Sequence, residues 1–95
     1  MIKLKSFKNK HFLIIGMGIT GISVSNSLLK GGANVYFWDD DLNKRKALRK
    51  KGYSLINNKN ITNIEYIMPS PGIATAGKNA HKYIKRLKTK KCKII

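Results

Sequence analysis

The fold of this chain is decided at residues 12–21, FLIIGMGITG, where an apolar run ends in three glycines spaced G-x-G-x-x-G. The four apolar residues are too few for a helix, and they predict a strand that is buried on both faces. Gly16 permits the tight turn out of this strand, Gly18 lets a diphosphate approach bare backbone, and Gly21 lets the next helix pack closely. The motif favours a phosphate site at a helix N-terminus over a purely structural glycine turn.

Strand and helix patterns alternate through the rest of the chain, as they do in proteins with a parallel sheet. Strand patterns are predicted at residues 34–38, 53–56, 64–68 and 92–95, and helical patterns at residues 20–30, 42–51 and 79–88. We therefore predict an α/β fold, a Rossmann-like doubly wound parallel sheet of about five strands in the order 3-2-1-4-5. Residues 1–95 are expected to form a single nucleotide-binding domain, with residues 1–10 as a basic lead-in.

Three consecutive aspartates, Asp39, Asp40 and Asp41, follow the second predicted strand in a chain with four acidic residues. At the carboxyl end of that strand, doubly wound folds recognise the ribose or base of a nucleotide. Asp41 is also placed to cap the helix predicted over 42–51, where a negative charge favours the helix dipole. Both interpretations hold together if Asp39 faces a ligand and Asp41 faces the helix.

A proline-rich turn, PSPGI at residues 69–73, follows the fourth predicted strand. Its two prolines remove two N–H donors, so we expect no strand to continue through it. In the predicted strand order this turn faces the glycine loop across a crevice, where a flat base could stack on backbone.

Residues 72–79, GIATAGKN, nearly match a triphosphate loop, but Asn79 replaces the hydroxyl that would hold Mg²⁺. We therefore interpret Gly77 as a flexible link into the last helix.

The formal net charge of +16 is compatible with a nucleic-acid or anionic membrane surface. Because lysine supplies almost all of it, solvated helix faces and a general attraction for anions are favoured over a dedicated nucleic-acid surface. The single cysteine, Cys92, fits a reducing cytoplasm, and His11 and His81 lack metal-ligand spacing and are expected at the surface. The apolar run at 12–15 is far shorter than the ~20 residues of a membrane helix, so we expect neither a membrane span nor a targeting segment.

Together, the loop at residues 16–21, Asp39 and the segment SPGIA at 70–74 resemble the N-terminal domain of the Mur ligase family. The resemblance is closest to the branch that adds D-glutamate, and it extends from about residue 11 to residue 95. Each motif is weak alone, whereas the glycine loop combined with a strand and S-P-G-I at this separation is specific. In that family the N-terminal domain holds the UDP part of the substrate, a central domain carries the ATP phosphate loop, and a C-terminal domain receives D-glutamate.

The resemblance implies a UDP site in this chain, without catalytic or metal-binding residues. It places Gly18, Ile19 and Thr20 near the diphosphate and uridine, with the Thr20 hydroxyl as an additional donor. Asp39 and Asp40 would meet the uracil, opposite the proline-rich turn. The implied UDP-binding residues are Gly16, Gly18, Ile19, Thr20, Gly21, Asp39, Asp40, Ser70, Pro71 and Gly72.

Two positions depart from the family's pattern. Pro69 stands where the family usually keeps a small or branched apolar residue. Asp41 adds a negative charge beside the nucleotide pocket, and we place its side chain outward as a helix cap because it would otherwise repel a diphosphate.

The resemblance implies that this chain is the N-terminal part of a larger, cytoplasmic, ATP-dependent ligase that joins an acid to a D-amino acid. That enzyme serves peptidoglycan synthesis, and thereby cell-wall biogenesis, cell division and cell shape. ATP and Mg²⁺ would be used by the absent central domain, with no cofactor in this one. The chain alone is expected to be an inactive monomer that binds UDP-N-acetylmuramoyl-L-alanine, and neither a specific nucleic acid nor a membrane.

Two other functions stay open at this point. An NAD-binding Rossmann module of a dehydrogenase or regulatory domain shares the glycine loop and the acidic residue, although the segment Ser70-Pro71-Gly72 argues against it. A basic domain that interacts with nucleic acid is supported by charge alone.

Overall fold

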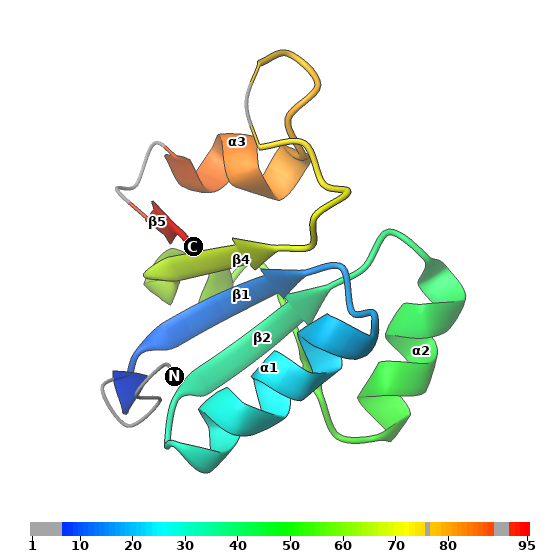
Figure 1. Ribbon diagram of the computed structural model, residues 1–95, viewed down its shortest axis with the longest axis vertical. Coiled ribbons are helices and arrows are strands. Elements are labelled where there is room, and N and C mark those ends of the chain that lie inside the picture. The colour runs from blue at the N-terminus through cyan, green and yellow to red at the C-terminus, as the bar shows by residue number, and fades with distance from the viewer. Residues whose placement is uncertain (1–6, 76, 89–91) are drawn as a thin grey trace.

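Figure 1 shows the computed structural model, which describes residues 7–75, 77–88 and 92–95. Its centre is a 5-stranded sheet with the order β3-β2-β1-β4-β5, in which all neighbouring strands are parallel. The strands are β1 (His11–Ile15), β2 (Asn34–Trp38), β3 (Ser54–Leu55), β4 (Tyr66–Pro69) and β5 (Lys93–Ile94). The helices are α1 (Ile19–Lys30), α2 (Leu42–Lys50), the 3-10 helix η2 (Asn60–Asn63) and α3 (Lys82–Lys88). The predicted fold class and strand order are confirmed.

The side chains of β1 alternate between two hydrophobic clusters, one on each face of the sheet. The cluster under α1 and α2 contains Phe12, Ile14, Met17, Leu28, Ala33, Val35, Phe37 and Leu48. The cluster under η2 and α3 contains Leu13, Ile15, Ile56, Ile61, Ile64, Ile67, Ile84 and Leu87. Because β1 is central and covered on both sides, each residue from 12 to 15 is at most 1% exposed, which explains its unbroken apolar run.

The register of the sheet brings three loops to one edge. Ile15, the last residue of β1, pairs with Trp38 at the end of β2 and with Pro69 at the end of β4. The glycine loop, the three aspartates and the proline-rich turn therefore leave the sheet at the same level, side by side. This edge is where doubly wound folds place their ligands.

Pro69 lies inside the β4 ladder, whereas the sequence predicted that the strand would stop before it. The N–H of Ser70 donates to the Ile15 carbonyl, so alternate residues of β4 face β1. The carbonyls of Glu65 and Ile67 accept bonds from the β5 side. By the same alternation the nitrogen of Pro69 faces the β5 side at the end of the strand, and its missing N–H breaks no bond to β1.

The predicted start of the last helix is wrong, because α3 begins at Lys82 and not at residue 79. Before it, the N–H of Ala80 donates to the Gly77 carbonyl and the N–H of His81 donates to the Ala74 carbonyl, 2.9 Å away. These two bonds stand in place of a first helical turn before Lys82. None of the helices in the described part of the chain has the length and apolar character that a membrane crossing requires.

Candidate functional site

A crevice of about 300 Å³ opens where the three loops meet. Its lining comes from the end of β1, the glycine loop, the aspartate segment, α2 and the proline-rich turn: Ile15, Gly16, Gly18, Asp39, Asp40, Lys44, Ser70 and Ile73. Five of the residues predicted to bind a nucleotide therefore line one cavity, although they lie up to 54 positions apart in sequence.

The other predicted site residues lie beside this crevice. Thr20, Gly21 and Pro71 line an adjacent, mostly apolar cavity of about 270 Å³ between the start of α1 and the end of β4. Gly16 and Ser70 line both cavities, and so form the ridge between them. Ile19 and Gly72 line neither cavity; Ile19 is 90% exposed at the start of α1, and Gly72 is exposed on the turn.

The fold itself requires two of the three glycines in the loop. Gly16 has a φ of +89°, and a Cβ there would lie 2.8 Å from Ser70 Oγ. A Cβ on Gly21 would lie 2.7 Å from the Gly16 carbonyl oxygen, so only glycine lets α1 begin this close to the loop. Gly18 differs, because its φ is −77° and an added Cβ would meet no atom of the described residues within 4 Å. The space that a side chain at position 18 would occupy is therefore open.

The N-terminus of α1 is uncapped. Gly18 is its N-cap residue and offers no side-chain acceptor, and the first turn holds no acidic residue. The first helical bond runs from the Ile22 N–H to the Gly18 carbonyl, so the N–H groups of Ile19, Thr20 and Gly21 have no acceptor within the helix. Such an end attracts an anion through its N–H groups and its dipole.

The Asp39 carboxylate holds the glycine loop against β2. Its Oδ2 accepts the Met17 N–H at 3.0 Å, and its Oδ1 accepts the Asp41 N–H at 2.9 Å. Arg45 donates to the Asp39 carbonyl at 2.6 Å and braces the same segment from α2. Each carboxylate oxygen can accept a second bond, so this structural role is compatible with a ligand contact. The predicted contact of Asp39 with a base or ribose stays a prediction.

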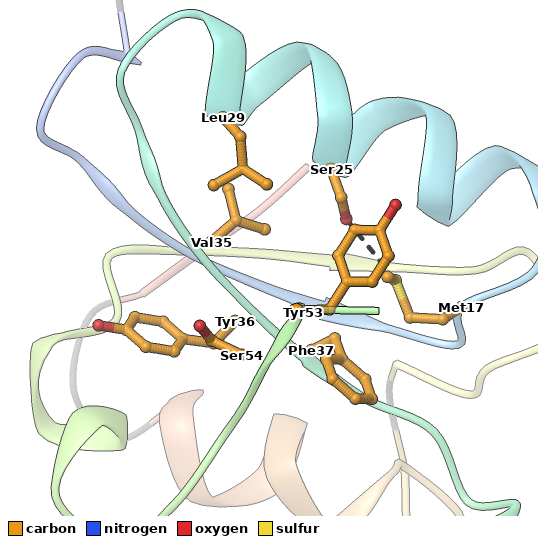
Figure 2. Close-up of a pocket in the computed structure, with 9 residues that line it drawn as sticks. Met17, Ser25, Leu29, Val35, Tyr36, Phe37, Tyr53 and Ser54 are labelled. Atoms are coloured by element: carbon orange, nitrogen blue, oxygen red, sulfur yellow. Dashed lines mark hydrogen bonds between the residues drawn. The ribbon is translucent and has the colours of Figure 1, made fainter. Parts of the chain in front are cut away.

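Met17 anchors the loop from its other side. Its side chain is 2% exposed, and Ser25 of α1 donates a hydrogen bond from Oγ to Met17 Sδ at 3.6 Å. Figure 2 shows Ser25 directed from α1 toward Met17, with the Tyr53 ring beside them. The cavity at this place has a volume of only about 40 Å³, far below what a nucleotide needs, so it is a gap in the packing between α1, β2 and β3.

Asp41 caps α2, as the sequence predicted. Its Oδ1 accepts the N–H groups of Asn43 and Lys44 at 2.9 and 3.3 Å. The cap directs the first turn of α2 toward the crevice, which Lys44 lines. Lys44 was not among the predicted site residues, because the lysines were interpreted together as solvated helix faces. Its position in the first turn after the aspartates was the available signal.

The expectation that His81 is a surface residue is wrong. Its side chain is only 8% exposed, and its Nε2 lies 2.9 Å from Asp40 Oδ1. The indole Nε1 of Trp38 donates to the same oxygen at 2.7 Å. The bonds from His81 and Trp38 stabilise the charged carboxylate and hold the pKa of Asp40 below its ordinary value of 3.8. The side chain of His11, by contrast, is 30% exposed beside Glu65 at the opposite edge of the sheet.

Residues 10–95 match the family described as the Mur ligase MurD-like, N-terminal domain. The chain belongs to this family. The match covers the glycine loop, the aspartates and the proline-rich turn, so the MurD-like N-terminal domain includes every residue of the crevice.

Curated relatives carry the name UDP-N-acetylmuramoylalanine--D-glutamate ligase. The protein from Wolbachia sp. subsp. Brugia malayi is 33% identical over 98% of this chain, and that from Wolbachia pipientis wMel is 31% identical over 98%. The protein from Lactobacillus acidophilus is 32% identical over 77% of this chain. The chain spans 20%, 18% and 18% of these three relatives, respectively, or about a fifth of their length.

A solved structure shares the fold. The putative D-3-phosphoglycerate dehydrogenase oxidoreductase from Ralstonia solanacearum superposes with a TM-score of 0.57 at 21% sequence identity. The superposition covers 67% of this chain and 19% of that one. At this identity the likeness concerns the Rossmann-like arrangement of strands and helices and says nothing of the ligand.

Replacing Asp39 is expected to destabilise the glycine loop. In Asp39→Ala the N–H groups of Met17 and Asp41 lose their acceptor, which should lower the free energy of unfolding by about 1–3 kcal/mol in urea titrations. Asp39→Asn keeps one acceptor oxygen and should lose roughly half as much. An alanine variant as stable as the wild type would show that these bonds do not hold the loop.

Proposed function

We propose that this domain binds the UDP part of UDP-N-acetylmuramoyl-L-alanine, as the nucleotide-holding domain of the ligase that adds D-glutamate during peptidoglycan synthesis. The observation that carries the proposal is Gly18. The fold accounts for Gly16 and Gly21, but none of the residues that the structure describes lies within 4 Å of a Cβ at position 18. A ligand that approaches the backbone there supplies the missing reason for a glycine.

The diphosphate fits the glycine-loop end of the crevice. The uncapped N–H groups at the start of α1 follow Gly18, and Gly18 and Lys44 both line the crevice. The backbone donors supply directed hydrogen bonds, and the ammonium group offsets the negative charge. This cation is needed because Asp39 and Asp40 line the same crevice and would otherwise repel a phosphate.

The base fits between the aspartates and the proline-rich turn. Asp40 lines one wall, and Ser70 and Ile73 line the other. A crevice of about 300 Å³ stands at the lower end of the range for small-molecule sites, which favours one pyrimidine nucleotide over a dinucleotide. Ile73 offers an apolar contact for the ring, and Ser70 offers a hydroxyl for its edge.

We further propose that this domain contributes binding and orientation, and that ATP and Mg²⁺ act in another part of a cytoplasmic ligase. The chain spans about a fifth of its curated relatives, which are named as ligases, and this leaves ample length for the remaining chemistry. The 95-residue chain by itself should therefore bind the nucleotide without joining D-glutamate to the substrate.

Gly18→Val should abolish binding and spare the fold. The backbone at Gly18 suits any residue, and the added atoms enter only the space that a diphosphate needs. Calorimetry should show UDP affinity reduced by more than about tenfold, with an unchanged circular dichroism spectrum. Ser23→Val, at an exposed position of α1, is the matched control and should bind UDP like the wild type. Unaltered UDP affinity in folded Gly18→Val would sink the proposed phosphate site.

Among nucleotides, UDP should bind more tightly than ADP or NAD. The narrow base site admits a pyrimidine more readily than a purine, and its contacts are directed hydrogen bonds rather than diffuse charge. Titration of all three at low and high salt tests this, because non-specific attraction to a strongly basic chain fades with ionic strength. Tighter binding of NAD would point to a dehydrogenase-like module, and binding of any polyanion only at low salt would point to a general basic surface.

A further inference from the structure

His81 uses both of its ring nitrogens, and it lies directly before α3. Its Nδ1 accepts the N–H of Tyr83 at 3.2 Å, and its Nε2 lies 2.9 Å from Asp40 Oδ1. The ring also stacks on Tyr83, with 5.9 Å between centroids and 19° between planes. Its backbone N–H closes the loop at the Ala74 carbonyl, and its carbonyl accepts the N–H of Lys85. Two hydrogen bonds and a stacking contact thus fix the ring, and two backbone bonds fix the residue that carries it.

These contacts assign the tautomer of the ring. Because Nδ1 accepts a backbone N–H, its lone pair must be free, and the hydrogen must be on Nε2, which donates to Asp40. His81 is therefore an N-cap residue of α3 through one nitrogen and a partner of β2 through the other. A protonated Nδ1 would place a hydrogen against the N–H of Tyr83.

Asp40 receives two donors at a single oxygen. Oδ1 accepts both the Trp38 indole and His81, and among the described residues Oδ2 accepts no hydrogen bond. Two cations also lie near the same indole, since Arg45 of α2 is 4.3 Å and Lys82 of α3 is 4.4 Å from its ring centroid. Trp38, Asp40 and His81, here called the clasp, therefore join the end of β2 to the start of α3.

We propose that His81 is a positioning residue for the nucleotide base: through the clasp it fixes the Asp40 carboxylate on one wall of the crevice. This inference rests on the proposed nucleotide site. One wall of the crevice is formed by the aspartate segment, and the other by the turn at Ser70 and Ile73. The bond between Asp40 and His81 links the aspartate wall to the segment that follows this turn in sequence. With Oδ1 held by two donors, Oδ2 is the oxygen left to accept a hydrogen bond from a ligand.

The two roles of His81 can be separated by substitution. In His81→Asn the amide oxygen takes the place of Nδ1 and keeps the cap, but the shorter side chain does not reach Asp40. In His81→Gln the terminal amide takes the place of Nε2 and keeps the bond to Asp40, but the cap is lost. The pair therefore tests positioning separately from helix stability.

The two variants should differ in whether they weaken mainly UDP binding or mainly the stability of the fold. His81→Asn should lose about tenfold in UDP affinity, the scale of one hydrogen bond to a charged group, while its melting temperature should fall no further than that of His81→Gln. His81→Gln should lower the melting temperature and keep the affinity within about threefold. In the Asp40→Ala background, His81→Asn should cost no further affinity, because the group that it positions is gone. The fluorescence of the chain's single tryptophan, Trp38, should shift in His81→Asn and stay near the wild type in His81→Gln.

The outcomes also separate this inference from the proposed function. If the wild type binds UDP and His81→Asn binds it equally well, the clasp has no positioning role and the nucleotide site stands. If affinity follows the melting temperature in both variants, His81 acts only through the stability of α3, and the inference is wrong. If the wild type does not bind UDP, the proposed function fails, and the positioning role fails with it.

Discussion

The glycine turn after β1 passes so close to the end of β4 that no side chain fits between them. A Cβ on Gly16 would lie 2.8 Å from Ser70 Oγ, and the φ of +89° excludes most side chains on its own. This close approach lets the chain turn directly from β1 into α1 beside the proline-rich turn. Gly21 packs closely on the Gly16 carbonyl, and α1 begins directly after Gly18, which lines the crevice. A bulkier turn would separate the two walls of the crevice.

The three aspartates that follow β2 organise three different elements around this turn. Asp39 holds the glycine loop through the Met17 N–H, Asp40 meets His81 before α3, and Asp41 caps α2. Three of the chain's four acidic residues thus lie at the edge of the sheet where the crevice is found. The basic excess elsewhere raises the local concentration of anionic ligands, but the backbone and these carboxylates give the site its shape.

Local patterns predicted most of this arrangement. The apolar run at 12–15 identified the central strand, and the glycine spacing identified the loop that follows it. Both features depend on the types of residues that are adjacent in sequence. His81 was missed because its partner Asp40 lies 41 positions away, and a lone histidine before a helix carries no local sign of that contact. The start of α3 was missed because the bond from His81 to the Ala74 carbonyl closes a loop where the residue types also suit a helix. Where the nucleotide contacts this domain is a prediction that both the sequence and the geometry support.

Amide chemical shifts measured during a UDP titration of the ¹⁵N-labelled chain test the central claim most directly. We predict that the N–H signals of Gly18, Ile19 and Thr20 move together with those of Asp40 and Ser70, with one dissociation constant that persists at high salt. Signals on the outer face of α2, such as that of Lys46, should stay in place. Shifts confined to the lysine-rich surfaces, with the glycine loop unmoved, would contradict the account.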